Sequence, residues 1–235
     1  MKKPGKKKTS KKKKAKRKAR PLVGKVDLVK ERPEFFKAGR KPVVVTLPRA
    51  SFLAIEGEGS PESEAFTAAF GALFGVAYTL KFAMKEEGRD FKVAPPEGLW
   101  WSDYDTSKLD DPEALWTVPR DEWRWKLVMM VPDFVRKGAV EAARAALFEK
   151  RGDATAKRVG LERIREGLCV QALHVGPYSD EPATIALMGE VMAEHGLVPH
   201  GLHHEIYLSD PRRTAPEKTR TILRQPVKRA SGKAK

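Results

Sequence analysis

Cysteine is almost absent from this sequence of 235 residues, because Cys169 is the single one. A lone cysteine cannot form an internal disulfide, and its apolar neighbours indicate a small buried side chain. The lack of disulfides fits a reducing compartment, so we expect a cytoplasmic protein.

Long hydrophobic runs are also missing. No apolar stretch approaches the roughly 18 residues that a membrane span needs, and the N-terminus is too basic and too poor in apolar residues for a secretory signal. We therefore expect no membrane span. The sequence also lacks a glycine-rich phosphate loop, a nucleotide fingerprint and a serine-nucleophile elbow, and we expect no cofactor.

Acidic residues are absent from both ends of the chain. Residues 1–20 contain thirteen Lys or Arg, and residues 228–235 contain four more. Without these charges the net charge of +15 becomes −2 for residues 21–227. We therefore expect a disordered lysine-rich tail (1–20), a linker or lead-in (21–39), a nearly neutral domain (40–227) and a basic C-terminal tail (228–235).

The lysine-rich tail has two interpretations. It can simply keep the protein soluble, or it can make sequence-independent contacts with nucleic acid or another anionic surface through counterion release. A fold that reads DNA is expected to carry positive charge on a structured face, and the central part of this chain does not provide that charge.

The hydrophobic pattern predicts alternating strands and helices. Strands are expected at 43–45, 52–55, 123–131, 168–175 and 203–208, with a short closing strand at 221–223 before Pro226. Helices are expected after Ser63, where apolar residues recur every three or four positions, and at about 138–150 and 181–195.

A weak internal repeat links the two halves of the domain. Gly57 and Ser60 follow one strand and precede a helix, and Gly176 and Ser179 do the same 119 residues later. The repeat predicts an α+β domain built from two pseudo-symmetric βαββ halves. A cleft between such halves is a common place for a ligand.

Glu205 is the leading candidate for chemistry. Alternation along the strand puts Ile206 and Leu208 on one face, with His203, Glu205 and Tyr207 on the other. A carboxylate that is partly buried there would have a raised pKa and could act as a general base near neutral pH. The alternative is a strand face in contact with water.

Aromatic residues gather in one part of the sequence. Trp100, Trp101, Trp123 and Trp125 fall within 26 positions, with Tyr104 among them. Their rings offer flat apolar walls for planar ligands, and they attract cations when a carboxylate is near. Adjacent Trp100 and Trp101 must face opposite ways in a strand, and at least one of the rings is expected in the core.

The histidines do not predict a metal site. His200, His203 and His204 lie beside Glu205, and His174 lies elsewhere in the sequence. Adjacent histidines in a strand diverge, so His203 and His204 are poorly placed to share one metal ion.

Several segments resemble the GyrI-like small-molecule-binding family, within the wider SOUL/GyrI superfamily. The resemblance covers about residues 40–227 and rests on 173–178, 203–211, 217–218 and 221–227. Residues 77–82 and 97–101 resemble one stand-alone branch of that family, whose members hydrolyse cyclopropane-bearing, DNA-alkylating natural products.

The resemblance implies an antiparallel sheet with helices on one face and a central cleft for a hydrophobic, aromatic small molecule. It further implies that Trp100, Trp101 and Trp125 stack on a flat substrate, while Glu205, helped by Glu181, activates a water. Tyr178 would donate a hydrogen bond to the carbonyl that gains charge. Further expected ligand contacts are Tyr78, Tyr104, His174, His203 and Tyr207.

Three functions stay open at this point. The first is hydrolytic detoxification of genotoxic compounds, and the second is a non-catalytic module that binds, sequesters or senses many drugs. A second acid paired with Glu205 would favour the enzyme, and an isolated acid would favour the binder. The third is association with nucleic acid through residues 1–20. The sequence leaves no room for a helix-turn-helix module before residue 40.

Overall fold

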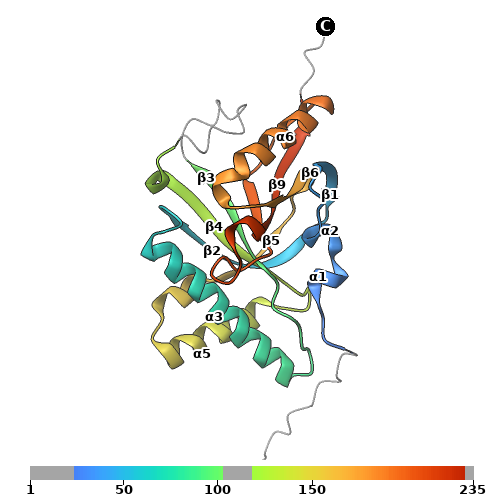
Figure 1. Cartoon of the computed structure of the whole chain (residues 1–235). Coiled ribbons are helices and arrows are strands. Elements are labelled where there is room, and N and C mark those ends of the chain that lie inside the picture. The colour runs from blue at the N-terminus through green and yellow to red at the C-terminus, as the bar shows by residue number, and fades with distance from the viewer. Residues whose placement is uncertain (1–23, 103–117, 231–235) are drawn as a thin grey trace, which may run out of the picture.

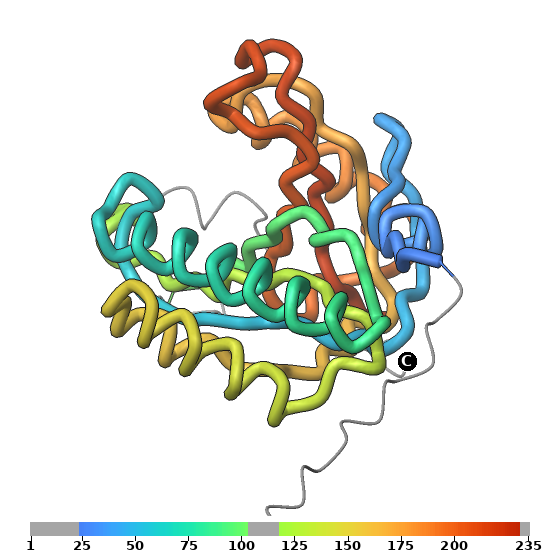
Figure 2. Tube along the Cα trace, turned by 90° about the horizontal axis from the view of Figure 1, so that it is seen from below, coloured from blue at the N-terminus to red at the C-terminus, as the bar shows by residue number. Residues whose placement is uncertain are grey.

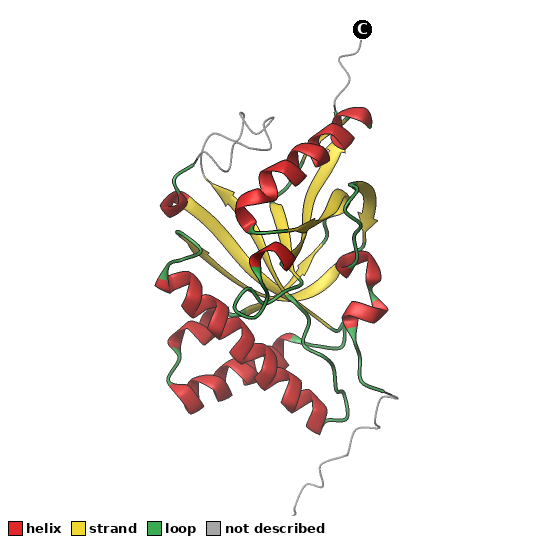
Figure 3. Ribbon diagram, viewed as in Figure 1, coloured by secondary structure: helices red, strands yellow, loops and turns green. Residues whose placement is uncertain are grey.

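The computed structural model describes residues 24–102 and 118–230, which form an antiparallel sheet with helices packed against it (Figures 1 and 3). The sheet has nine strands in the order β1-β6-β9-β8-β3-β4-β2-β5, and β7 pairs with the end of β9. The strands are β1 (Val43–Leu47), β2 (Ala50–Glu58), β3 (Pro96–Ser102), β4 (Trp123–Val131), β5 (Gly160–Ile164), β6 (Gly167–Val175), β7 (Leu197–Pro199), β8 (His203–Tyr207) and β9 (Arg220–Arg229). The helices used below are α1 (Leu28–Glu31), α2 (Pro33–Phe36), α3 (Glu64–Glu86), α5 (Lys137–Arg151) and α6 (Glu181–Glu194).

The sheet order contains the predicted internal symmetry. In the first half, β2 leads into α3 and then into β3 and β4, and β4 lies between β3 and β2. In the second half, β6 leads into α6 and then into β8 and β9, and β9 lies between β8 and β6. The halves join where β3 pairs with β8, from Glu97 opposite Ile206 to Trp100 opposite His203. The α+β fold with two similar halves is therefore confirmed.

Helix α3 packs along the first half of the sheet. The Ser63 hydroxyl accepts a hydrogen bond from the Phe66 amide at 3.1 Å and so caps the helix N-terminus. Its buried face presents Ala69, Ala72, Leu73, Val76, Ala77 and Leu80. Helix α5 lies beside it (Figure 2). A Cβ atom on Gly75 would come within 2.7 Å of Leu147 Cδ2, so the glycine allows the two helices to approach closely.

By length and composition, α3 is the one helix of the described chain that could cross a membrane. A core helix of a globular domain passes the same test, and the buried side of α3 packs on β2, β4 and α5. The apolar character of α3 is therefore accounted for in part by the core of the domain.

Helix α6 covers the second half and forms a smaller core of its own. Ile185, Met188 and Met192 belong to one cluster with Val170, Ala172 and Leu223 of the sheet. Leu223 is the register partner of Glu205. Phe66 of α3 stacks on Trp100, which is the register partner of His203. Both helices thus lie on the face of the sheet that carries Glu205.

The structured part of the chain extends beyond the expected domain limits. Residues 21–39 were predicted to be a linker or lead-in, and the described part of this segment contains α1 and α2, with Phe35 and Phe36 buried. At the other end, β9 runs from Arg220 to Arg229 instead of covering only 221–223. The short closing strand was therefore wrong in length, and β9 includes the first two residues of the predicted basic tail.

Candidate functional site

Glu205 lies in the middle of β8, where the two halves of the sheet meet. Its register partners are Gly98 of β3 and Leu223 of β9. Only 6 % of the residue is exposed. The carboxylate therefore does not sit on a strand face in contact with water, and this alternative from the sequence is wrong.

A second carboxylate belongs to the same site. Glu181 is the first residue of α6 and is 1 % exposed, and neither of its carboxylate oxygens has a hydrogen-bond partner within residues 24–102 and 118–230. Burial, together with the nearby charge of Glu205, raises the pKa of Glu181 far above its usual range. Glu181 therefore keeps its proton at neutral pH, and the two acids differ in what they can do.

Tyr207 connects the Glu205 strand to the aromatic residues. Its hydroxyl accepts a hydrogen bond from Trp100 Nε1 at 3.0 Å. Burial raises the pKa of Tyr207 well above its ordinary value, and the charge of Glu205 and a hydrogen bond to it act in the same direction. The indole N–H, the phenol and the carboxylate thus form a short polar chain inside an apolar region.

Two more of the predicted residues reach this cluster. The ring of Tyr178 meets the ring of Tyr207 edge to face at 6.1 Å, and 37 % of Tyr178 is exposed. Burial raises the pKa of Tyr178 to about 12, helped by Glu205 and Glu181. His203 Nε2 lies 3.4 Å from Glu205 Oε1. The structure therefore brings Glu205, Glu181, Tyr178, Tyr207 and His203 together with Trp100, which we call the carboxylate cluster.

His174 stabilises the turn that leads from β6 to α6, next to the carboxylate cluster. Its Nε2 donates to the Pro177 carbonyl at 3.1 Å, and its Nδ1 is 2.9 Å from the Thr184 hydroxyl. Both ring nitrogens are therefore used within the turn that leads to Tyr178 and α6. The side chain therefore holds the turn together, and the expected contact of His174 with a ligand stays a prediction.

Of the three tryptophans predicted to stack on the ligand, Trp125 and Trp101 lie away from the carboxylate cluster. Trp125 is 1 % exposed, and its ring lies so close to Gly57 that a Cβ atom there would come within 2.2 Å. It is a core residue with no ring face free for a ligand. Trp101 points to the opposite side of β3 from Trp100, away from Glu205. The expected stacking role is therefore not supported for Trp101 or Trp125.

Two predicted tyrosines lie outside the cluster for different reasons. Tyr78 is 47 % exposed on α3, and its ring contacts are with Phe74 and Phe82. Tyr104 lies outside the described residues. Neither residue contributes to the geometry of the carboxylate cluster that the structure describes.

Phe66 and Phe70 of α3 form an aromatic wall that the sequence analysis missed. The Phe66 ring stacks on Trp100 at 5.6 Å, meets Trp125 edge to face at 5.2 Å and stacks on Phe70 at 5.9 Å. Both phenylalanines are half-buried. Their four-residue spacing was visible, but it was interpreted only as the apolar face of a helix.

A buried ionic network lies on the opposite face of the same strands. His204 Nδ1 is 2.8 Å from Glu166 Oε1, and Arg224 Nη1 is 3.0 Å from Glu166 Oε2. His204 Nε2 also lies 3.1 Å from Glu97 Oε2, although the two atoms are not aligned for a hydrogen bond. Arg224 completes its bonds with Gln171 Oε1 at 3.0 Å and the Phe35 carbonyl at 2.8 Å.

The charges in this network fix its protonation states. Burial lowers the pKa of His204, but Glu166 and Glu97 outweigh burial and raise it to about 9. Burial raises the pKa of Glu166, but His204 and Arg224 outweigh burial and lower it to about 2. His204 is therefore a buried structural cation. It is adjacent to Glu205 in the sequence, but its side chain lies on the opposite face of the sheet.

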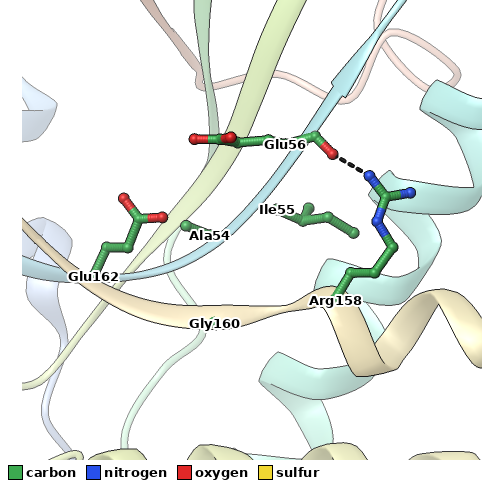
Figure 4. A pocket seen from close by; sticks show the side chains of 6 residues that line it. All are labelled: Ala54, Ile55, Glu56, Arg158, Gly160 and Glu162. Carbon is green, nitrogen blue, oxygen red and sulfur yellow. Dashed lines mark hydrogen bonds between the residues drawn. The ribbon is translucent and has the colours of Figure 1, made fainter.

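A pocket in the first half of the described sheet lies away from the carboxylate cluster. It has a volume of about 270 Å³ and is lined by Ala54, Ile55, Glu56, Arg158, Gly160 and Glu162 (Figure 4). Arg158 donates to the Glu56 carbonyl across its rim. The residues that line this pocket do not include Glu205. The carboxylate cluster is therefore defined by the contacts among its own residues. Within the described residues, no group of His, Cys, Asp or Glu is arranged to hold a metal ion.

Known proteins resemble this chain over most of its length. A family model for the GyrI-like small molecule binding domain matches residues 40–228. An uncharacterized conserved protein from Listeria innocua has 39 % identity and a TM-score of 0.78 over 87 % of this chain and all of its own. A hydrolase from Listeria innocua has 39 % identity and a TM-score of 0.75 with the same coverage. The EcmrR C-terminal domain shares the fold at 11 % identity and a TM-score of 0.53, over 80 % of this chain and 98 % of its own. No curated protein matches the chain.

Proposed function

This chain belongs to the GyrI-like small-molecule-binding domain family, and from that premise we propose that it hydrolyses flat, hydrophobic compounds that carry a strained cyclopropane ring. The reaction would detoxify compounds that otherwise alkylate DNA. The 39 % identity to a hydrolase from Listeria innocua supports a hydrolytic reaction. The observation that carries the proposal is the pairing of Glu205 with a second buried carboxyl group, Glu181.

Two acids in one site support catalysis better than binding alone. A site that only holds a lipophilic cation needs one negative charge beside aromatic rings. Glu181 adds a carboxyl group that is buried without a hydrogen-bond partner among the described residues, at a cost to stability. A buried acid that keeps its proton, next to a second carboxyl group, is an arrangement that general acid–base catalysis uses.

The roles follow from the protonation states. The substrate would contact Phe66 of the aromatic wall together with Trp100 and Tyr178, with its cyclopropane carbon toward Glu205. Glu205 accepts a proton from water while the water oxygen bonds to that carbon. The ring C–C bond breaks, and its electron pair moves through the conjugated system to the carbonyl oxygen. Glu181 donates its proton to that oxygen, and Tyr178 donates a hydrogen bond to it.

Polar neighbours orient the proposed base. Tyr207 holds the Glu205 carboxylate through the hydrogen bond that Trp100 supports from the other side, and His203 lies within 3.4 Å. Locking a base in this way is expected to reduce the reorganisation that the reaction requires. The proposed reaction uses no metal or cofactor.

The test is incubation of the purified protein with a cyclopropane-bearing indole alkylator in ¹⁸O-labelled water, followed by mass spectrometry. We expect a ring-opened alcohol that contains one labelled oxygen, and a rate at least about a hundredfold lower for Glu205→Gln. Glu194→Gln is the matched control, because Glu194 is exposed on the same helix as Glu181. Equal rates for the wild type and Glu205→Gln would remove Glu205 from the mechanism.

Binding without turnover would support the second function, a module that sequesters or senses drugs. Isothermal titration with the same compound and with a planar lipophilic cation separates the two functions. A binder is expected to hold both ligands through Glu205 and to release them unchanged.

A further inference from the structure

Thr221 places a buried hydroxyl group on the same face of the sheet as Glu205. It stands in β9, opposite Tyr207 of β8 on one side and opposite His174 of β6 on the other. Directly opposite side chains lie on the same face of a sheet, so Thr221 lies between these two residues on the face that α6 covers. Only 1 % of Thr221 is exposed, and its Oγ1 atom has no hydrogen-bond partner within the described parts of the chain.

Glu181 approaches the same end of the carboxylate cluster from the helix. It is the first residue of α6, and His174 reaches the hydroxyl of Thr184 in the next turn of that helix. Burial raises the pKa of Tyr207 well above its ordinary value, and Glu181 adds to this shift, so its carboxyl group lies near the neighbour of Thr221. Glu181 and Thr221 are thus two buried groups, neither with a hydrogen-bond partner among residues 24–102 and 118–230.

The hydroxyl of Thr221 is costly where it stands. A buried polar group without a partner destabilises a fold relative to an apolar group of the same shape, and most buried polar groups are therefore hydrogen-bonded. Valine would fill the place of Thr221 without this cost. In sites that recognise a polar group of a ligand, buried protein groups are left unpaired until that ligand supplies the partner.

We propose that Thr221 and Glu181 together bind one oxygen atom of the ligand, so that the site selects flat aromatic compounds that carry a carbonyl group. A carbonyl oxygen has two lone pairs and can accept from both O–H groups, whereas a hydrocarbon of the same shape leaves both unpaired. Phe66 and Trp100, on the other side of Glu205, contact flat ligands of either kind. The rings therefore provide affinity, and the oxygen provides selectivity.

This inference rests on the proposed function, because the oxygen bound by Thr221 is the one that gains charge when the strained ring opens. It gives Thr221 a ligand-binding role beside the proton donor Glu181. An unreactive ligand can bind without turnover, so the selectivity and the hydrolysis can be tested separately.

The experiment is equilibrium dialysis of the full chain with fluorenone and with fluorene, two planar tricyclic compounds that differ by one carbonyl oxygen. We expect the wild type to bind fluorenone at least about tenfold more tightly than fluorene. Thr221→Val should reduce this preference at least about threefold and leave the binding of fluorene unchanged. Thr221→Ser keeps the hydroxyl and should retain the preference.

Urea denaturation distinguishes a ligand-binding hydroxyl from a structural one. The unfolding midpoint of Thr221→Val should be higher than that of the wild type, because the hydroxyl has no partner to lose among the described residues. Thr219→Val is the matched control, since Thr219 is 3 % exposed but its hydroxyl donates to the Ala215 carbonyl at 3.5 Å. This variant should have a lower midpoint and the same preference for fluorenone as the wild type.

The outcomes separate this proposal from the hydrolase function. Binding of neither compound by the wild type, equal binding of both, or an undiminished preference in Thr221→Val would overturn the role of Thr221. A lower unfolding midpoint for Thr221→Val would assign the hydroxyl a partner within the fold and would overturn it as well. Selective binding of fluorenone through Thr221, without hydrolysis of the strained-ring compound, would support this inference and reject only the hydrolase function.

Discussion

Trp100 Nε1 donates a 3.0 Å hydrogen bond to the hydroxyl of Tyr207, and this bond crosses the junction between the two halves of the sheet. Trp100 belongs to β3 in the first half, and Tyr207 belongs to β8 in the second. Gly98 makes the contact possible, because a Cβ atom there would lie 2.6 Å from Tyr207 Oη and 2.9 Å from Trp100 Nε1. The polar chain to Glu205 therefore depends on a glycine at position 98, where any side chain would occupy the space of this contact.

Gly98→Ala is expected to disturb the site more than the fold. The added methyl group would push the Tyr207 hydroxyl and the indole apart, at a cost of about 1–3 kcal/mol in the free energy of unfolding. We expect turnover to fall at least about tenfold, because Glu205 loses its fixed partner. Chemical denaturation and steady-state kinetics measure the two effects.

Gly71→Ala is the control for that substitution. Nothing lies within 4 Å of a Cβ atom at Gly71, which is exposed within α3. Alanine there should raise the free energy of unfolding by roughly 0.5–1 kcal/mol and leave turnover unchanged. A loss of activity in Gly71→Ala, or full activity in Gly98→Ala, would contradict the proposed role of Gly98.

Glu181→Gln is expected to stabilise the protein. A buried acid whose folded pKa is raised contributes its full stability only below the unfolded pKa, near 4.5, and loses it as the pH rises. The gain from Gln should therefore be small near pH 4 and reach about 2 kcal/mol near pH 7. Urea denaturation between pH 4 and pH 8 measures it, while turnover should fall because the proton donor is gone.

Glu194→Gln again serves as the reference for Glu181→Gln, since its side chain is exposed. Its stability difference from the wild type should stay within about 0.5 kcal/mol at every pH. A Glu181→Gln variant that is less stable than the wild type at pH 7 would show that the carboxyl group has a partner that stabilises its charge.

The His204 network predicts a second dependence of stability on pH. The folded pKa of about 9 exceeds the unfolded value near 6.5, so the contribution of His204 is complete below pH 6.5 and is lost between pH 6.5 and 9. Glu166 acts in the opposite direction, because its pKa of about 2 makes its contribution disappear as the pH falls below 4.5. Between pH 6.5 and 9, His204 alone should thus account for a loss of up to roughly 3 kcal/mol in the wild type, in addition to the loss from Glu181.

His204→Gln removes the contribution of His204 to the pH dependence of the free energy of unfolding. The variant should be several kcal/mol less stable at pH 6, because Glu166 and Glu97 lose their buried cation, but it should lose less stability between pH 6.5 and 9. His195→Gln, at an exposed position, should keep the slope of the wild type. Equal slopes for the wild type and His204→Gln would refute the assignment of His204 as a buried cation.

His174→Phe tests the turn before α6. Phenylalanine fills the same space but removes the hydrogen bonds to Pro177 and Thr184, at a cost of about 1–3 kcal/mol. Because the turn places Tyr178 and Glu181, we expect the turnover number to fall more than the Michaelis constant rises. An unchanged turnover number would separate His174 from the site.

The sequence pattern predicted the fold because each half of the domain is encoded locally. The Gly57–Ser60 and Gly176–Ser179 repeat marks the two strand-to-helix turns, and alternation around Glu205 gave its orientation correctly. Local periodicity cannot tell which ring lies deepest. Trp125 is in the core because Gly57, far away in the sequence, leaves space for its ring.

Pro226 explains why the last strand was predicted too short. Proline usually argues against a central strand because it cannot donate a hydrogen bond. Pairing of β8 with β9 stops at Arg224, and pairing of β7 with β9 resumes at Val227. Pro226 falls in this gap, where its carbonyl accepts from the His200 amide at 2.8 Å and no amide is needed. Only the tertiary arrangement shows that the gap exists.

The ionic network was missed for a related reason. Arg224 stands in a strand between Leu223 and Gln225, and its three hydrogen-bond partners come from segments as distant as Phe35. A charged residue inside an apolar strand is a signal, but the sequence does not name its partners.

The pairing of β3 with β8 also has a consequence for the order of folding. Residues 50–131 and 167–229 can each form their own strand ladders, since β2, β3 and β4 associate within one segment and β6, β8 and β9 within the other. Within the described strands, the sheet is continuous between the two only through β3 and β8. An intermediate with both ladders formed but still apart would look native by circular dichroism and yet bind nothing. A compound that occupies the site would tie the two segments together and slow their separation.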